Sequence, residues 1–267
     1  MNFNFSNIFY VFIFILALEL WCTINYFELN VHVGQPFKVP FECTTVVVDG
    51  FTDPNGVARF CLGCLSNVHR DEVVERARPH IGKGIELRHD EGGDVWLKVN
   101  SEHSVFLESP YLDSQCGDRP AVHKIYSSAE LKVFDLKYSY RKMLDQAQHV
   151  QLARNMMKAN IHGVSPEMAA AQNVGVDDYQ KHCVLRMSFV KGFGPDYNRK
   201  RIEDTPCWIE VKLHWPLKIL DQLLQPLDDA PSIQPQHHDQ PQQPQQPETK
   251  QETKSEEKQD QVPTSSS

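Results

Sequence analysis

A short basic segment in the second half of the chain carries side chains suited to bind a phosphorylated ligand. Lys191–Arg201 reads KGFGPDYNRKR, with four cations against one acid, a net charge of +3 in a chain whose total is −8. Gly192 and Gly194 allow close approach of the backbone, and Tyr197 and Arg199 can donate hydrogen bonds to phosphate oxygens. The alternative is a solvated loop without a ligand, which is the usual role of a run of charges.

Cys61 and Cys64 are spaced as in half of a zinc site or as in a redox pair. A zinc site needs a second pair of ligands, and the sequence has no other Cys-x-x-Cys; Cys183 has only His182 beside it. We expect Cys61 and Cys64 to lie in a strand, where residues three apart point to opposite faces. The sequence therefore favours buried thiols and no metal site.

The motifs of common enzyme classes do not occur in the sequence. It has no G-x-S-x-G nucleophile elbow, no Walker loop and no dinucleotide-binding fingerprint. The net negative charge excludes a protein that coats nucleic acid through a dense cationic surface. We therefore expect no enzymatic activity and no cofactor.

Strand patterns dominate the first half of the chain, and helical patterns follow. Alternating aromatic and β-branched residues predict strands at 24–31, 37–48, 59–65, 85–88, 95–99, 105–107, 184–190 and 207–214, with a loop over 111–121. Apolar residues at spacings of three and four predict helices at 71–77, 138–160, 176–183 and 216–224. Because no regular alternation of strands and helices is present, the order predicts a mainly β fold, a β-sandwich with helices at its ends.

The amino-terminal residues 1–20 differ from the rest of the chain. Ile8–Leu18 is an unbroken apolar run of 11 residues, about the length of the apolar core of a secretory signal. The first basic residue is Lys38, so the positive flank of a signal peptide is missing. Residues 1–20 are therefore either a signal peptide or a leader that does not belong to the domain.

The carboxy-terminal residues 229–267 form a Gln/Pro-rich tail. From Pro231 onward the only large apolar residues are Ile233 and Val262. Such a segment cannot bury enough apolar surface to offset the entropy lost on ordering, so we expect it to be disordered. The remaining residues, 21–228, are predicted to form one domain.

Several ordered motifs between residues 21 and 228 resemble the MAD-homology 2 (MH2) domain of Smad proteins. They are RMSFVKGFGPDY at 186–197, TPCWIE at 205–210, FCLG at 60–63, LSNVHR at 65–70, HIGKG at 80–84, GDVW at 93–96 and HKIY at 123–126. The resemblance implies a β-sandwich capped by a three-helix bundle at one end and by a loop-helix region at the other.

Within the Smad family the sequence resembles the common-mediator (co-Smad) branch. GPDY at 194–197, VDD at 176–178 and a helical insertion at about 146–173 are similar to that branch. Receptor-regulated Smads end in a Ser-Ser-x-Ser tail that a receptor kinase phosphorylates. This chain has Thr264 in place of the first serine.

The resemblance also implies roles for individual residues. In Smad proteins, MH2 domains pack head to tail, and the basic loop of one domain receives the phosphoserine tail of its neighbour. Carried over by motif, the phosphoserine-binding residues are Lys191, Tyr197, Arg199, Lys124 and Ser66, and the trimer interface pairs Asp49 and Arg59 with Asp221. The sequence departs from the family at Phe193, where tryptophan is usual, and at Asn198, where this branch often has proline.

The implied function is that of a non-catalytic scaffold in TGF-β- or BMP-type signalling, located in the cytoplasm and nucleus. It would bind phosphorylated receptor-regulated Smads as a heterotrimer and regulate transcription with cofactors. DNA would be reached only through partners, and no membrane is expected. The odd number of 7 cysteines agrees with a reducing compartment. The alternative is an exported or truncated form of the same sandwich that interferes with signalling or has lost it.

Overall fold

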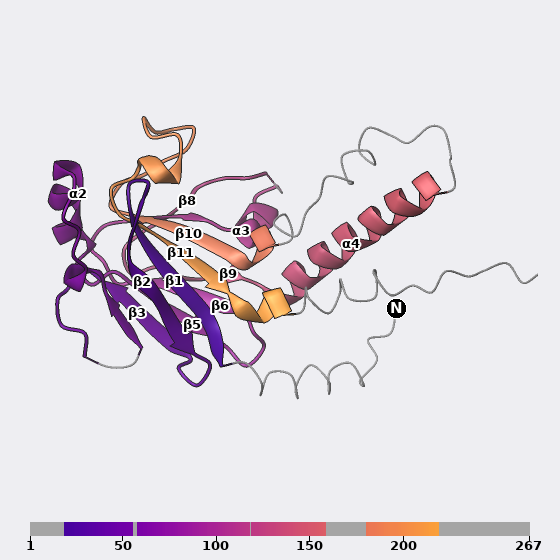
Figure 1. The fold of residues 1–267 in the computed structure, drawn as a ribbon, viewed down its shortest axis with the longest axis horizontal. Coiled ribbons are helices and arrows are strands. Elements are labelled where there is room, and N and C mark those ends of the chain that lie inside the picture. The colour runs from indigo at the N-terminus through magenta and orange to yellow at the C-terminus, as the bar shows by residue number, and fades with distance from the viewer. Residues whose placement is uncertain (1–18, 56–57, 118, 159–179, 219–267) are drawn as a thin grey trace, which may run out of the picture. The chain divides into compact units, whose positions relative to one another are not determined.

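The computed structural model describes residues 19–55, 58–117, 119–158 and 180–218 of the chain (Figure 1). Within these residues two β-sheets pack face to face and enclose the main hydrophobic core. The predicted β-sandwich is therefore confirmed. Residues 1–18 and 219–267, which include most of the leader, the tail and Asp221, lie outside the described residues, as do residues 159–179 of the predicted insertion.

The first sheet has six strands in the order β2-β1-β11-β10-β7-β8. Their bounds are β1 Leu20–Glu28, β2 Val31–Pro40, β7 Val105–Glu108, β8 His123–Ile125, β10 Val184–Phe189 and β11 Trp208–Leu213. Neighbouring strands run antiparallel throughout this sheet.

The second sheet has five strands in the order β4-β3-β5-β6-β9. Their bounds are β3 Thr45–Asp49, β4 Arg59–Cys61, β5 Ile85–His89, β6 Val95–Val99 and β9 Glu130–Phe134. The pair β3–β4 is parallel, and the other pairs are antiparallel.

The core is built from side chains that alternate along the strands. In β1 the residues Cys22, Ile24 and Tyr26 are each 0% exposed and point to the same face. They pack with fully buried residues of the second sheet such as Val48 and Leu87. Burial of each large apolar side chain contributes about 1.5–3 kcal/mol, which makes this alternation the main reason for the sandwich.

The helices are short except for one, and polar side chains bind the backbone N–H groups at the amino-terminal ends of three α-helices. The helices include α2 Glu72–Ala77, α3 Pro110–Gln115 and α4 Leu136–Lys158, with single 3₁₀ turns η1 Leu62–Cys64, η2 Arg78–Ile81, η3 Lys181–Cys183 and η4 Ile202–Asp204; residues 214–218 are helical as well. Asp71 caps α2 by accepting a hydrogen bond from Val73 N–H at 2.7 Å. At α4, Asp94 accepts from Leu136 N–H at 2.9 Å, which ties this helix to the second sheet. No helix among the described residues is long and apolar enough to span a membrane.

Several sequence predictions need correction. The predicted loop 111–121 contains α3, which Ser109 caps by accepting from Leu112 N–H while proline occupies the first helical turn. The predicted strand 59–65 ends at Cys61 and continues as η1. The edge strands β8 and β9 were not predicted. Of the predicted helix 176–183 only the part from residue 180 is described, and there η3 forms a single 3₁₀ turn.

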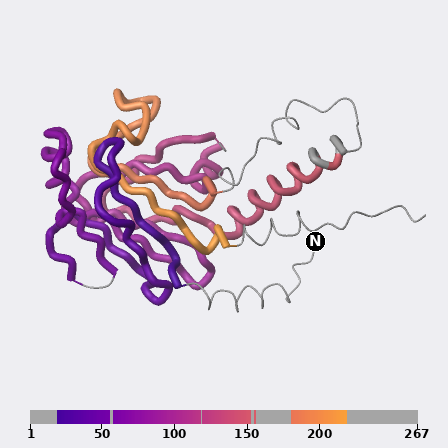
Figure 2. Tube along the Cα trace, in the orientation of Figure 1, coloured from indigo at the N-terminus to yellow at the C-terminus, as the bar shows by residue number. Residues whose placement is uncertain are grey.

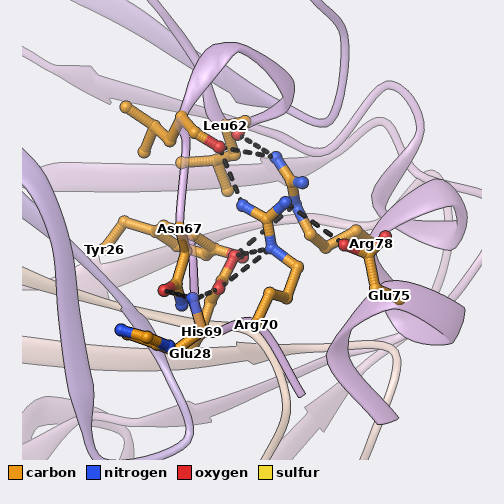
Figure 3. A network of polar contacts seen from close by, with 9 residues as sticks. Tyr26, Glu28, Leu62, Asn67, His69, Arg70, Glu75 and Arg78 are labelled. Carbon is orange, nitrogen blue, oxygen red and sulfur yellow. Dashed lines mark hydrogen bonds and ion pairs between the residues drawn. The ribbon is translucent and has the colours of Figure 1, made fainter. Parts of the chain in front are cut away.

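A buried carboxylate joins the first sheet to the segment that carries η1, α2 and η2. Glu28, at the end of β1, is 2% exposed and accepts hydrogen bonds from Arg70 Nε at 2.9 and 3.1 Å, from Asn67 Nδ2 at 2.7 Å and from Tyr26 Oη at 3.2 Å (Figure 3). Arg78 Nε lies 3.6 Å from the same carboxylate, beyond hydrogen-bond length but within range for an ion pair. The two arginines also bind backbone carbonyls of residues 62 and 65, so Glu28 holds the turn η1 in place through them.

We predict that Glu28→Gln destabilises the domain by about 3–5 kcal/mol, because two largely buried guanidinium groups lose their counter-charge. Urea unfolding followed by tryptophan fluorescence measures the effect. The control is Glu75→Gln, since this exposed carboxylate reaches Arg70 only at 3.4 Å and such pairs contribute about 0–1 kcal/mol. Equal unfolding free energies for the two variants would contradict the role given to Glu28.

Candidate functional site

An aromatic ring on the outer face of the first sheet organises part of the predicted phosphate site. In β7 the neighbouring residues Val105 and Leu107 point into the core, so Phe106 points to the outer face of the sheet. It is nevertheless only 5% exposed. The Tyr197 ring meets the Phe106 ring edge-on, with 5.4 Å between ring centroids. Lys124 lies opposite Phe106 on β8, and its Nζ is 6.0 Å from the Phe106 ring and 5.0 Å from the Tyr126 ring. Two predicted ligands therefore converge on one ring.

The basic loop between β10 and β11 is fixed by its own small core. Phe193 is 1% and Ile202 3% exposed, and both pack with Phe106 and Trp208. Trp208 stacks on Phe27 with ring centroids 4.1 Å apart and donates its indole N–H to the Leu29 carbonyl at 2.7 Å. Figure 2 shows this loop, in orange, next to the turn of the β1–β2 hairpin, in indigo. The segment is thus a positioned loop, and Phe193 supports it from inside.

Backbone hydrogen bonds close the loop into a compact shape. Gly194 N–H donates to the Arg199 carbonyl at 2.8 Å, and Tyr197 N–H donates to the Gly194 carbonyl at 3.1 Å. At Gly192 a Cβ atom would lie 2.5 Å from the Tyr197 ring and 2.8 Å from the Phe106 ring. The glycine is therefore required by the close approach of two aromatic rings.

The four cations of the loop fall into two classes. Lys200 donates to the Pro195 carbonyl at 3.1 Å, and Arg201 pairs with Asp204 at 3.3 Å. Lys191 and Arg199 make no side-chain hydrogen bond or ion pair within the described part of the chain. The two predicted ligands are thus the cations left available to an anion.

Ser66 lies on a different segment from the other predicted ligands. It is exposed in the stretch that follows η1, beside Asn67, which donates to Glu28. Across the described ranges no hydrogen bond or ion pair joins Ser66 to Lys124 or to the basic loop. The structure therefore groups Lys124 and Tyr197 around Phe106 and carries Lys191 and Arg199 on the same loop as Tyr197, whereas Ser66 comes from the segment after η1.

The predicted interface residues Asp49 and Arg59 pair with each other on adjacent parallel strands. Arg59 Nε lies 2.6 Å from Asp49 Oδ2, while Asp49 Oδ1 accepts from Phe51 N–H at 2.9 Å. This hydrogen bond and the charge of Asp49, which is 1% exposed, raise the pKa of the Arg59 guanidinium above its ordinary value. Asp221, the third member of the predicted contact, lies outside the described residues.

An open pocket of about 390 Å³ lies over this ion pair. Its lining includes Lys83 and Lys98, which sequence analysis did not single out, together with Asp49, Phe51, Arg59, Val47, Val99, Asn100 and Ser128. Three cations against one carboxylate leave an excess of positive charge, which suits a carboxylate from a partner. Lys98 could have been noticed because it points outward between the buried residues Leu97 and Val99.

The cysteine prediction is half correct. Cys61 is buried, whereas Cys64 is exposed, because the chain leaves the strand after Cys61 and turns. Among the described residues no group of three or more His, Cys, Asp or Glu side chains could hold a metal ion.

Comparisons with known proteins agree with the resemblance seen in the sequence. A profile of the MH2 domain matches residues 19–214. The chain is 50% identical over 234 residues to "Mothers against decapentaplegic homolog 4" of Homo sapiens, and the same holds for the Rattus norvegicus protein; these alignments cover 79% of this chain and 42% of each relative. It is 40% identical over 218 residues to "Dwarfin sma-4" of Caenorhabditis elegans, covering 78% of this chain and 38% of that protein. The chain thus spans about two fifths of the length of these relatives.

We predict that Gly192→Ala distorts the basic loop, because the added methyl group displaces the Tyr197 ring from Phe106. Overpacking of this kind costs about 1–3 kcal/mol. Thermal unfolding measures the loss, and Gly92→Ala is the control, since its Cβ would meet only the Asp90 carboxylate, at 3.2 Å. An unchanged midpoint for Gly192→Ala would mean that the two rings do not constrain the loop.

Proposed function

Because the chain belongs to the MH2 domain family of Smad proteins, we propose that it is a non-catalytic signalling scaffold whose basic loop binds a phosphoserine segment of a partner Smad. The observation that carries the proposal is the division of cations in the loop. Lys191 and Arg199 have no side-chain partner among the residues that the structure describes, while the loop that presents them is anchored by Phe193 and Trp208. Preorganised, unpaired cations bind a phosphate without first breaking ion pairs of their own.

The chemistry of the surrounding residues fits a doubly charged phosphate. Arg199 can grip two phosphate oxygens through its planar guanidinium, and Lys191 and Lys124 add positive charge. Tyr197 offers a hydroxyl donor, and its ring is positioned by Phe106. Ser66 would join such a site only if the phosphorylated segment extends as far as the loop after η1.

We further propose that the domain assembles with receptor-regulated Smads as a heterotrimer that regulates transcription with cofactors, in the cytoplasm and nucleus. In this arrangement the pocket over Asp49 and Arg59 receives Asp221 or its counterpart from a neighbouring domain. The excess of cations at the pocket supports this role, since an incoming carboxylate finds Lys83 and Lys98 beside Arg59. DNA would be reached through the partners of the complex.

The phosphoserine proposal predicts that Arg199→Ala lowers affinity for a Ser-Ser-x-Ser peptide phosphorylated on its serines. Loss of one charge-assisted contact costs about 1.5–3 kcal/mol, which is about ten- to a hundredfold in the dissociation constant. Isothermal titration calorimetry with the full chain measures it. The matched control is Lys200→Ala, because Lys200 is already engaged by the Pro195 carbonyl and its loss should have a much smaller effect.

Three outcomes of this titration are informative. Strong binding of the phosphorylated peptide, weak binding of the plain peptide and a loss confined to Arg199→Ala support the proposal. Equal binding of both peptides would show that the loop does not recognise phosphate. Equal losses in both variants would show that the loop attracts the peptide by its net charge alone.

The assembly proposal predicts that Asp221→Ala weakens the complex with a phosphorylated receptor-regulated Smad and leaves the domain folded. Removal of one partner of a desolvated ion pair costs about 2–5 kcal/mol of binding. Sizing chromatography of the mixture, with circular dichroism of the variant alone, measures both effects. Asp239→Ala, in the Gln/Pro-rich tail, is the control. A folded Asp221→Ala variant that assembles as well as the control would remove Asp221 from the interface.

A further inference from the structure

The two cysteines of the Cys-x-x-Cys motif bracket a single tight turn. Cys61 ends β4 and is the N-cap residue directly before η1, and Cys64 is the last residue of that 3₁₀ turn. A 3₁₀ helix has three residues per turn, so residues three apart lie on the same side. Turns of this kind keep the first and fourth Cα atoms within about 7 Å, close to the range of about 4.4–6.8 Å that a disulfide spans. The turn thus brings the two cysteines to the same side, whereas a strand would have pointed them to opposite faces.

The two thiols differ in access. Cys64 is exposed, so an oxidant in solution can reach it. Cys61 is 4% exposed and donates its S–H to the Asp53 carbonyl at 3.1 Å. Burial, together with the neighbouring Asp49 carboxylate, raises the pKa of the Cys61 thiol to about 11. Cys64 is therefore the thiol that meets the oxidant first, and Cys61, three residues before it, is placed to act as the resolving cysteine.

The turn is held tightly against the segment that follows β3. A Cβ atom on Gly63 would lie 2.4 Å from the Phe51 carbonyl oxygen and 2.5 Å from that of Gly50, so only glycine fits between the two cysteines. Asp49 is also the register partner of Cys61 in the β3–β4 pair. A new covalent bond at the Cys61 sulfur would therefore alter the contacts of residues 49–53.

We propose that Cys61 and Cys64 form a reversible intrachain disulfide when the protein meets a hydroperoxide such as hydrogen peroxide. The Cys64 thiolate attacks one peroxide oxygen, the O–O bond breaks, and a sulfenic acid and water result once the released hydroxide is protonated. The Cys61 sulfur then attacks the Cys64 sulfur, the S–O bond breaks, and a second water leaves with the Cys61 proton. Two thiols and one peroxide thus give one disulfide and two waters, and a thiol reductant reverses the step.

The disulfide alters the surface around Asp49. Its formation removes the hydrogen bond from Cys61 to Asp53, so the segment 50–55, which is exposed from residue 51 onward, loses one of its attachments. The same segment donates Phe51 N–H to Asp49 at the pocket shared with Arg59. Oxidation would therefore weaken the assembly of the domain with a partner at this pocket. This effect on assembly rests on the proposed function, whereas formation of the disulfide does not.

Trypsin offers a direct test, because cleavage after Arg59 and Arg70 releases both cysteines in one peptide, residues 60–70. The full chain is treated with hydrogen peroxide, blocked with iodoacetamide, digested and analysed by mass spectrometry. We expect the peptide to lose two hydrogens and to carry no alkyl group, and dithiothreitol added before blocking to restore two alkyl groups. Cys64→Ser should abolish the oxidised peptide, and Cys116→Ser, at the other exposed cysteine, should leave it unchanged.

The possible results separate the disulfide from the assembly role. A doubly alkylated peptide, or Cys64 overoxidised beside an alkylated Cys61, would overturn the disulfide. If the disulfide forms, faster hydrogen exchange in residues 50–55 of the oxidised wild type, absent from Cys64→Ser, supports its effect on the pocket, and unchanged exchange overturns that effect. Failure of the reduced protein to join a phosphorylated partner would count against the proposed function alone.

Discussion

The arrangement of both candidate surfaces depends on the end of β1, where the carboxylate of Glu28 is buried. Its position at the end of β1 places a negative charge where water cannot compensate it, so the fold must supply donors around it. Arg70 and Arg78 do so, and they come from the segment between β4 and β5. One residue further, Leu29 receives the indole N–H of Trp208, which supports the basic loop. The end of β1 therefore fixes the loop-helix segment on one side and the basic loop on the other.

The outer face of the first sheet explains why the basic loop takes one defined conformation. Antiparallel strands with one face in the core usually leave the other face to water. Here Phe106 and Trp208 point to that outer face, and the loop covers them with Phe193 and Ile202. Burial of these side chains offsets the entropy lost when a loop rich in glycine and charge takes one conformation. The entropy cost of ordering the loop is thus offset by apolar contacts within the domain itself, without a ligand.

Much of the fold followed from side-chain periodicity, and the exceptions have physical causes. Long alternating strands such as β1 and β11 were predictable because each buries every second residue. The edge strands β8 and β9 were missed because only some of the residues of an edge strand are buried, and β8 is only three residues long. The strand after Arg59 was predicted too long because Leu62 is fully buried in a turn, so its burial resembled that of a strand residue. Ser109 and Pro110 form a helix-start signal, a capping serine followed by proline, which the prediction of a loop over 111–121 overlooked.

For the site, the sequence could identify which residues are charged but not which charges are already used. Lys200 and Arg199 are neighbours in a run of cations, and composition treats them alike. In the folded loop the Pro195 carbonyl engages Lys200, while the Arg199 guanidinium forms no hydrogen bond or ion pair with the part of the chain that the structure describes. The same holds for Asp49, whose carboxylate is committed to Arg59 and to Phe51 N–H within its own chain. A partner that approaches this face would consequently meet Lys83 and Lys98, for which the described residues provide no ion pair. We therefore expect the specificity of both candidate surfaces to depend on the charges that are not paired within the domain.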